Sequence, residues 1–211
     1  MATISTVDDS PNESALYLAA LPFARAQVLS RPCPVPASPG VYGWWFRELP
    51  ADIDTSSCAK KDGLTLLYTG ISPSAPPANG KAPSTQDIRK RIRTHYTGNA
   101  EGSTLRKTLG CLLSDRLGIE LRRVGSGNRR TFVAGEKTLS EWMAENALVS
   151  WVCHPEPWVL EHQLITSLDV PLNLDANAHN GFYSTLKSVR RAAVVRANEL
   201  PVLPNPGVGG R

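Results

Sequence analysis

Three runs of β-prone and apolar residues constrain the fold of this chain most strongly. They occupy residues 40–46, 64–69 and 147–153, and their β-branched and aromatic side chains are typical of strands. A sizeable loop separates the first two runs, so these strands could pair as antiparallel neighbours. Segments with helical spacing of apolar residues lie between and after the runs. The pattern predicts an α+β fold with a small, mostly antiparallel, three-stranded central sheet flanked by helices.

Helical patterns occupy much of the remaining sequence. An Ala/Leu-rich segment at 13–29 predicts an N-terminal helix, with a break near Pro22. Ser84 or Thr85 could cap a helix, and a proline in the first turn marks another helix at 157–168. Further helices are predicted at 104–117, 139–146 and 184–198, and the last of them is amphipathic. A short strand is predicted at 119–124.

The length and composition fit one compact domain with extensions, or at most two small domains. The chain has 211 residues, of which 41% are hydrophobic. Residues 31–39 hold four prolines and are predicted to form an extended linker. We therefore expect an N-terminal helical extension with this linker at 1–37, a main domain at 38–199, and a disordered Pro/Gly-rich tail at 200–211.

The cysteines and the apolar segments indicate a cytoplasmic protein. The four cysteines are widely scattered, and no CxxC pair is present, so a structural zinc site is not expected. A secreted chain of this kind would usually carry a denser disulfide framework. We see no basic segment followed by an apolar one at the N-terminus, and no apolar run long enough to span a bilayer.

Basic residues cluster between Asp87 and Lys107. The cluster consists of Arg89, Lys90, Arg91, Arg93, Arg106 and Lys107. Only Asp87 and Glu101 oppose these charges within the segment. Such a cluster could attract a polyanion such as nucleic acid, or it could be a solvated helix face. The formal net charge of +4 does not decide between the two.

Glu161 lies on the apolar stripe of its predicted helix. It is three or four residues from Trp158, Leu164 and Ile165, which places its carboxylate on the same face as these side chains. A carboxylate that points toward a core is costly unless it is paired, hydrogen-bonded or bound to a metal. The sequence leaves open a metal site and a salt bridge at the edge of the core.

A second helix carries an arginine and a histidine on one flank. Ile88, Ile92 and Tyr96 repeat every four residues and should face the sheet. Arg91 and His95 are four residues apart and lie beside this stripe. An arginine there could hold a phosphate with its fork of donors, and a histidine could transfer a proton, but ordinary surface charge would give the same pattern.

Two strand motifs add a resemblance to a known family. Gly40-Val41-Tyr42 and Tyr68-Thr69-Gly70 resemble the two motifs that give the GIY-YIG nuclease superfamily its name. Thr69 stands where the family usually has isoleucine or valine. The resemblance covers about residues 38–175. The loop at 71–84 is longer than in compact members, and residues 122–146 look inserted.

The remaining family positions are filled in the same order. Arg91 matches the essential arginine of the family, and His95 follows it by one helical turn. Glu161 matches the glutamate that binds a divalent metal, and Asn173 matches an asparagine that follows this helix. The resemblance implies a GIY-YIG-like fold and a metal-dependent endonuclease that hydrolyses phosphodiester bonds in DNA.

The resemblance also implies a role for each catalytic residue. Glu161 would bind Mg²⁺ or Mn²⁺ together with water molecules, and Arg91 would bind the scissile phosphate. Tyr42 would act as the general base, with Tyr68 orienting the water or the phosphate. His95 could take the proton from Tyr42 or be the base itself. Because an unperturbed tyrosine has a pKa near ~10, Tyr42 would need a nearby cation to ionise at neutral pH.

The other predicted site residues bind DNA or support the fold. The predicted DNA-binding residues are Arg89, Lys90, Arg93, Arg106 and Lys107, and the predicted supporting residues are Gly40, Gly70 and Asn173. The polar segment 173–180 could bring Asn177 or His179 to the substrate, or it could be an Asx-rich turn that caps the last helix.

Two rival interpretations keep the same fold. The chain could be a catalytically silent module that binds nucleic acid, or an interaction subunit of a larger complex. In the second case the N-terminal helix could dock a partner protein or a second copy of the chain. A small-molecule enzyme is disfavoured because the sequence has no phosphate-binding glycine loop and no dinucleotide fingerprint.

Overall fold

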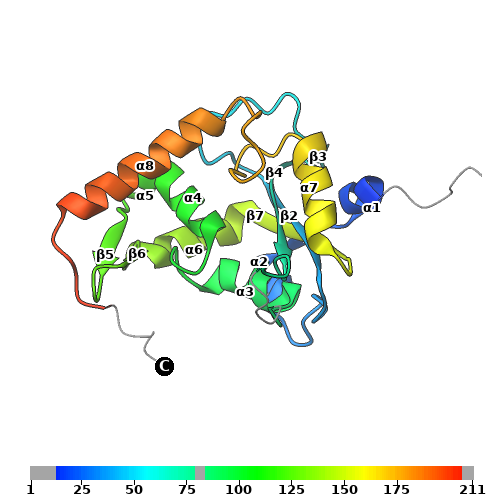
Figure 1. Cartoon of the computed structure of the whole chain (residues 1–211), viewed down its shortest axis with the longest axis horizontal. Coiled ribbons are helices and arrows are strands. Elements are labelled where there is room, and N and C mark those ends of the chain that lie inside the picture. The colour runs from blue at the N-terminus through cyan, green and yellow to red at the C-terminus, as the bar shows by residue number, and fades with distance from the viewer. Residues whose placement is uncertain (1–12, 79–83, 206–211) are drawn as a thin grey trace, which may run out of the picture.

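The structure, a computed structural model, describes residues 13–78 and 84–205. Its centre is an antiparallel sheet with the strand order β1-β7-β2-β4-β3 (Figure 1). The three inner strands are β2 (Gly40–Phe46), β4 (Leu64–Ser72) and β7 (Ala147–Cys153). They match the three predicted strands, so the predicted α+β class with an antiparallel sheet is confirmed.

The predicted number of strands is wrong, because the sheet has five strands rather than three. The two additional strands, β1 (Phe23–Ala24) and β3 (Lys60–Lys61), are two residues long and lie at the two edges. Runs this short show no periodicity, so the sequence pattern does not reveal them. Each covers part of an edge whose backbone groups would otherwise lack partners.

The predicted N-terminal helix divides into three elements. Helix α1 (Glu13–Ala19) ends before Pro22, β1 follows, and the short α2 (Arg25–Val28) comes next. Because a proline disfavours helical geometry in the residue before it, the chain leaves the helix where the break is expected. Phe23 and Ala24 then pair with Val149 and Leu148 of β7. The N-terminal segment is therefore part of the central sheet.

Alternation along the strands divides the core between two faces of the sheet. On one face, α1 and α7 (Pro157–Ser167) pack against Val41, Trp45 and Leu66. The other face buries Tyr42, Trp44 and Phe46 under α3 (Ile88–Thr97), α4 (Thr104–Leu112) and α6 (Gly135–Asn146). The predicted stripe of α3 is confirmed, since its isoleucines and Tyr96 are fully buried. Its N-cap is Asp87, and not Ser84 or Thr85, because the Asp87 side chain accepts the Lys90 N–H.

A peripheral layer lies beyond α4. The predicted helix at 104–117 is split into α4 and α5 (Ser114–Leu117), and a separate hairpin follows, made of β5 (Arg122–Val124) and β6 (Arg129–Thr131). The last helix, α8 (Tyr183–Glu199), packs on α4 and β5 (Figure 1).

The segment after α8 was predicted to be disordered from residue 200 onward. Its first residues are held in place instead: the Leu203 N–H donates to the Arg123 carbonyl, and the Leu203 carbonyl accepts from Gly125. Residues 206–211, like residues 1–12, lie outside the described residues. Among the helices within 13–78 and 84–205, none has both the length and the apolar character needed to cross a bilayer.

Candidate active site

The two predicted tyrosines lie on the same face of the sheet. Tyr42 pairs with Gly70, and Tyr68 pairs with Trp44 on the neighbouring strand. A register shift between Trp44 and Trp45 makes Leu67 an extra residue of β4, so Leu67 and Tyr68 both reach the core cluster that contains Tyr42. Tyr42 is 1% exposed and Tyr68 is 9% exposed.

The glycines of both strand motifs allow close approach of neighbouring atoms. A Cβ atom on Gly70 would lie 2.8 Å from the Tyr42 hydroxyl and 2.9 Å from two of its ring carbons. A Cβ atom on Gly40 would collide with the Val152 carbonyl oxygen of β7. Both positions therefore have a steric reason to be glycine. At Gly70 the space is taken by the side chain of Tyr42, and at Gly40 it is taken by the backbone of β7.

We predict that Gly70→Ala displaces the Tyr42 ring and lowers both stability and activity. Forcing a methyl group into this contact should cost about 1–3 kcal/mol of unfolding free energy, measured by urea denaturation. Any cleavage activity should fall with it, because Tyr42 loses its position. Gly181→Ala is the matched control, since nothing lies within 4 Å of a Cβ at Gly181. Equal effects of the two variants would show that the space around Tyr42 is not limiting.

His95 connects Tyr42 to the start of α4. Its Nε2 atom shares a 2.8 Å hydrogen bond with the Tyr42 hydroxyl, and its Nδ1 atom shares a 2.7 Å hydrogen bond with Ser103 Oγ. Ser103 also caps α4, because its Oγ accepts the Arg106 N–H. Sequence spacing places His95 on the flank of α3, yet the side chain is fully buried. Ser103 was missed because its link to His95 depends on the packing of two helices.

Burial is the main influence on the protonation of Tyr42 and His95. Burial lowers the pKa of His95 well below its usual value, and the neighbouring Arg91 and Arg106 lower it further. Burial raises the pKa of Tyr42, whereas Arg91 opposes this change. At neutral pH both side chains are therefore neutral, and the low pKa of His95 disfavours its protonated form.

Arg91 lies beside both tyrosines. Its positive charge lowers the pKa of Tyr42 and Tyr68. Burial acts in the opposite direction and is the larger effect, so the pKa of Tyr68 is raised to about 12. Its Nη1 atom donates to the Gly102 carbonyl at 3.0 Å, which anchors one end of the guanidinium. Tyr42 is a further side-chain hydrogen-bond partner, and the donors that Gly102 and Tyr42 do not use are available to a ligand.

The other basic residues predicted to bind DNA are less free than the sequence indicates. Arg89 Nε donates to the Val35 carbonyl at 2.6 Å, and Lys90 forms an ion pair with Asp87 at 3.2 Å. Arg93 is exposed, and Lys107 is partly buried.

Arg106 requires a correction, because its side chain is 0% exposed and cannot reach a nucleic acid. It binds Glu136 of α6 through Nη2 at 2.7 Å and Nε at 3.0 Å, and Nη1 donates to the His95 carbonyl at 3.2 Å. Arg106 therefore joins α3, α4 and α6 beneath the site.

Glu161 of α7 lines a cleft of about 440 Å³. The cleft is bounded by Tyr68, Thr104, Trp158, Glu161, His162, Ile165, Leu172, Asn173, Leu174, Asp175, Ala176 and Arg190. Burial and, to a lesser extent, the negative charge of Asp175 together raise the pKa of Glu161 to about 7. Within residues 13–78 and 84–205 its carboxylate has no hydrogen bond and no ion pair. The predicted salt bridge at the core edge is therefore absent from the described part of the chain.

The composition of the cleft fits a hard divalent cation. Glu161 and Asp175 supply two carboxylates, and Mg²⁺ typically binds proteins through one or two carboxylates while it keeps several waters. No group of three or more His, Cys, Asp or Glu side chains forms a metal-binding cluster in the described ranges. Asp175 lies in the loop between α7 and α8, so helical spacing did not single it out.

The loop after α7 is held by its asparagines. Asn173 bonds the backbone of Thr69 twice, because its Oδ1 accepts the Thr69 N–H and its Nδ2 donates to the Thr69 carbonyl, both at 2.9 Å. Asn177 is fully buried and donates to the Val170 and Asn173 carbonyls, so it does not face a substrate. Asn173 thus fixes the loop that carries Asp175 to the strand that carries Tyr68.

A third tyrosine reaches the site from the N-terminal segment. Tyr17 of α1 is fully buried over β2, and its hydroxyl lies 2.5 Å from the place that a Cβ atom on Gly43 would occupy. Burial raises the pKa of Tyr17, and the charge of Glu161 raises it further. The sequence offered no signal for this residue, since it lies outside the segment that resembles the family.

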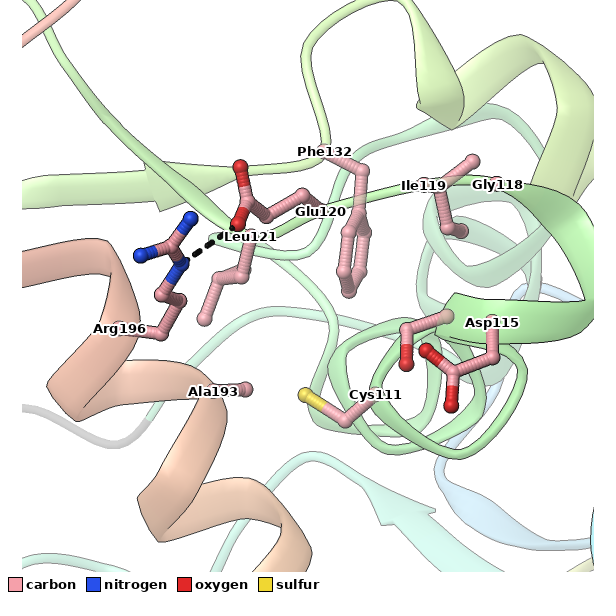
Figure 2. A pocket seen from close by; sticks show the side chains of 10 residues that line it. Cys111, Asp115, Gly118, Ile119, Glu120, Leu121, Phe132, Ala193 and Arg196 are labelled. Atoms are coloured by element: carbon pink, nitrogen blue, oxygen red, sulfur yellow. Dashed lines mark hydrogen bonds and ion pairs between the residues drawn. The ribbon is translucent and has the colours of Figure 1, made fainter. Parts of the chain in front are cut away.

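A second cavity, of about 530 Å³, lies between α4, α5 and α8 (Figure 2). Phe132 and Leu121 project into it, and the Arg196–Glu120 ion pair of 3.1 Å closes one side. It shares no lining residue with the cleft of Glu161 and contains none of the predicted catalytic residues.

Comparison with known proteins agrees with this geometry. The chain matches a family model described as the GIY-YIG catalytic domain over residues 40–192, which is well over half of its length. No curated protein and no solved structure matches the chain. The match contains both strand motifs, α3 with its arginine and histidine, and α7 with Glu161. The chain therefore belongs to the GIY-YIG catalytic domain family.

Proposed function

We propose that this protein is a metal-dependent endonuclease that hydrolyses phosphodiester bonds in DNA. The family to which it belongs consists generally of endonucleases. The observation that carries the proposal is Glu161, a largely buried carboxylate on a cleft wall that has no cationic partner in the described chain and lies near a second acid, Asp175. Such a group is costly to retain unless a cation binds it.

Glu161 would hold Mg²⁺ or Mn²⁺ together with water molecules, and Asp175 would contribute through its charge. When bound, the ion would supply Lewis-acid stabilisation of the negative charge that develops on the phosphate. Arg91 would bind the scissile phosphate with the donors that Gly102 and Tyr42 do not use. Tyr68 would orient the phosphate or the attacking water, because it lines the cleft beside Glu161.

Proton transfer would use the hydrogen bonds behind Tyr68. In this proposal the Tyr42 hydroxyl gives its proton to Nε2 of the neutral His95 and accepts one from the attacking water. Burial opposes both the ionisation of Tyr42 and the protonation of His95, so the charge of Arg91 would have to stabilise the phenolate as the proton moves to the unprotonated Nε2 atom. Ser103 would hold the ring in place through Nδ1.

A cleavage assay on the full chain tests the proposal. Linear duplex, single-stranded and branched DNA and an RNA of the same sequence are incubated with Mg²⁺ or Mn²⁺, with and without chelator. We expect cleavage of at least one DNA form with metal, its loss in chelator, and its return when excess Mg²⁺ is added. Cleavage that persists in chelator contradicts the metal role. DNA binding without cleavage under every condition supports the rival, a catalytically silent module.

A further inference from the structure

Helix α8 contributes one side chain to the cleft. Arg190 lines the cleft together with Glu161 and Tyr68, and its charge lowers the pKa of Tyr68. Figure 1 shows α7 and α8 on either side of the loop that joins them, which is the loop that carries Asp175. Within the described residues the Arg190 guanidinium has no ion pair and no hydrogen bond. A partly buried cation is thus available inside the cleft that holds the candidate metal ligand.

Arg190 belongs to a basic stripe on α8. Lys187, Arg190 and Arg191 are spaced so that they lie on one side of the helix, within about 6 Å along its axis. Lys187 and Arg191 are exposed, and the Lys187 Nζ atom lies 5.4 Å from the centre of the Tyr183 ring. The only acidic residue of α8 is Glu199, at its far end. The stripe therefore presents positive charge that the helix itself does not neutralise.

Other arginines near α8 are occupied by the protein. Arg196 is paired with Glu120, and Arg123 donates to the carbonyls of Ala197, Asn198 and Leu200 at the end of the helix. Arg196 and Arg123 therefore stabilise the fold, whereas Arg190 has no such partner among the described residues. On α3, the predicted DNA-binding helix, Arg89 and Lys90 are likewise tied to backbone and to an aspartate.

We propose that Lys187, Arg190 and Arg191, here named the α8 track, bind consecutive phosphates of the nucleic-acid backbone and lead it into the cleft. The inference rests on the proposed function and adds the surface that holds the substrate. Arg190 contacts the phosphate nearest the reacting one, because it alone of the three lines the cleft. Lys187 and Arg191 contact phosphates outside it. These contacts carry no sequence information, since phosphates are the same at every base pair.

Salt-dependent binding tests the track separately from catalysis. A labelled DNA duplex is titrated with the full chain in chelator, which prevents cleavage, over a range of about 50 to 300 mM salt. Log K falls as log salt rises, and each lost phosphate contact lowers the magnitude of this negative slope, here called the slope, by about 0.9. Lys187→Gln/Arg191→Gln should therefore lower the slope by about two, and adding Arg190→Gln should lower it by about one more. Arg196→Gln, on the same helix but paired with Glu120, should leave the slope unchanged.

A double variant on α3 tests the alternative, in which the DNA backbone lies on α3. If Lys90→Gln/Arg93→Gln lowers the slope and the α8 variants do not, the track is wrong and the backbone lies on α3. If the α8 variants bind with the wild-type slope while the wild-type chain cleaves DNA in Mg²⁺, the track fails and the nuclease proposal stands. If the slope falls as expected but no DNA form is cleaved, the track stands and the nuclease proposal fails. Thermal unfolding of every variant checks that the fold is retained.

Discussion

Glu161→Gln should lower the rate of metal-dependent cleavage by at least about 10³-fold, because the metal site loses its charged ligand. The same change should stabilise the metal-free protein at high pH. The pKa of Glu161 is raised from its ordinary value of 4.5 to about 7, so the folded state holds this proton more tightly than the unfolded state. The fold consequently loses stability as the pH rises from about 4.5 through 7, and glutamine removes that loss.

Urea unfolding in chelator measures the second effect. At pH 8 the unfolding free energy of Glu161→Gln should exceed that of the wild type by about 1–3 kcal/mol, and at pH 4 the two should agree. Glu145→Gln is the control, because Glu145 is exposed on α6 and away from the cleft. Wild-type cleavage by Glu161→Gln would exclude Glu161 as the metal ligand. Lost cleavage without a gain in stability at pH 8 would mean that burial of the carboxylate is not costly.

Arg106→Met should lower the free energy of unfolding by about 3–5 kcal/mol, since it leaves Glu136 without its buried cation. The fully buried guanidinium binds Glu136 through two nitrogens and also donates to the hydroxyl of Ser140 and the carbonyl of His95. Loss of the His95 contact should also disturb the link to Tyr42.

A second substitution separates charge from packing. Arg106→Met/Glu136→Gln should recover part of the lost stability, because the uncompensated carboxylate is gone while an amide oxygen can still accept the N–H groups of Ala100 and Phe132. Lys107→Met is the control at the neighbouring, partly buried position. A loss below about 1 kcal/mol in Arg106→Met would contradict the structural role and reopen its assignment to DNA binding.

Much of the sheet could be predicted because strand formation leaves a local signal. The bounds of β2 and β7 follow from unbroken β-prone runs, and α7 follows from its N1 proline. Strands β1 and β3 could not be found in this way, because their pairing depends on which edges the folded sheet leaves open. The cap of α3 was misplaced because Ser84, Thr85 and Asp87 are all good N-cap residues.

In the candidate site, too, helical spacing predicted single positions but not the contacts between residues that are far apart in the sequence. The position of Glu161 on an apolar stripe was sufficient to predict a carboxylate near the core, whereas its neighbour Asp175 lies in the loop after α7, where no helical spacing applies. Arg106 looked like a surface cation because its partner, Glu136, is 30 residues away in a segment that resembled an insertion. Helical spacing alone cannot show such a partner.

A Mn²⁺ titration that follows bound metal by electron paramagnetic resonance and cleavage rate on the same samples tests most directly whether an ion at Glu161 drives the reaction. For the wild-type chain, bound Mn²⁺ and the cleavage rate should rise together, and both should be absent in Glu161→Gln. Equal Mn²⁺ binding by the two proteins, or cleavage by the wild type at Mn²⁺ concentrations where none is bound, would contradict the assignment.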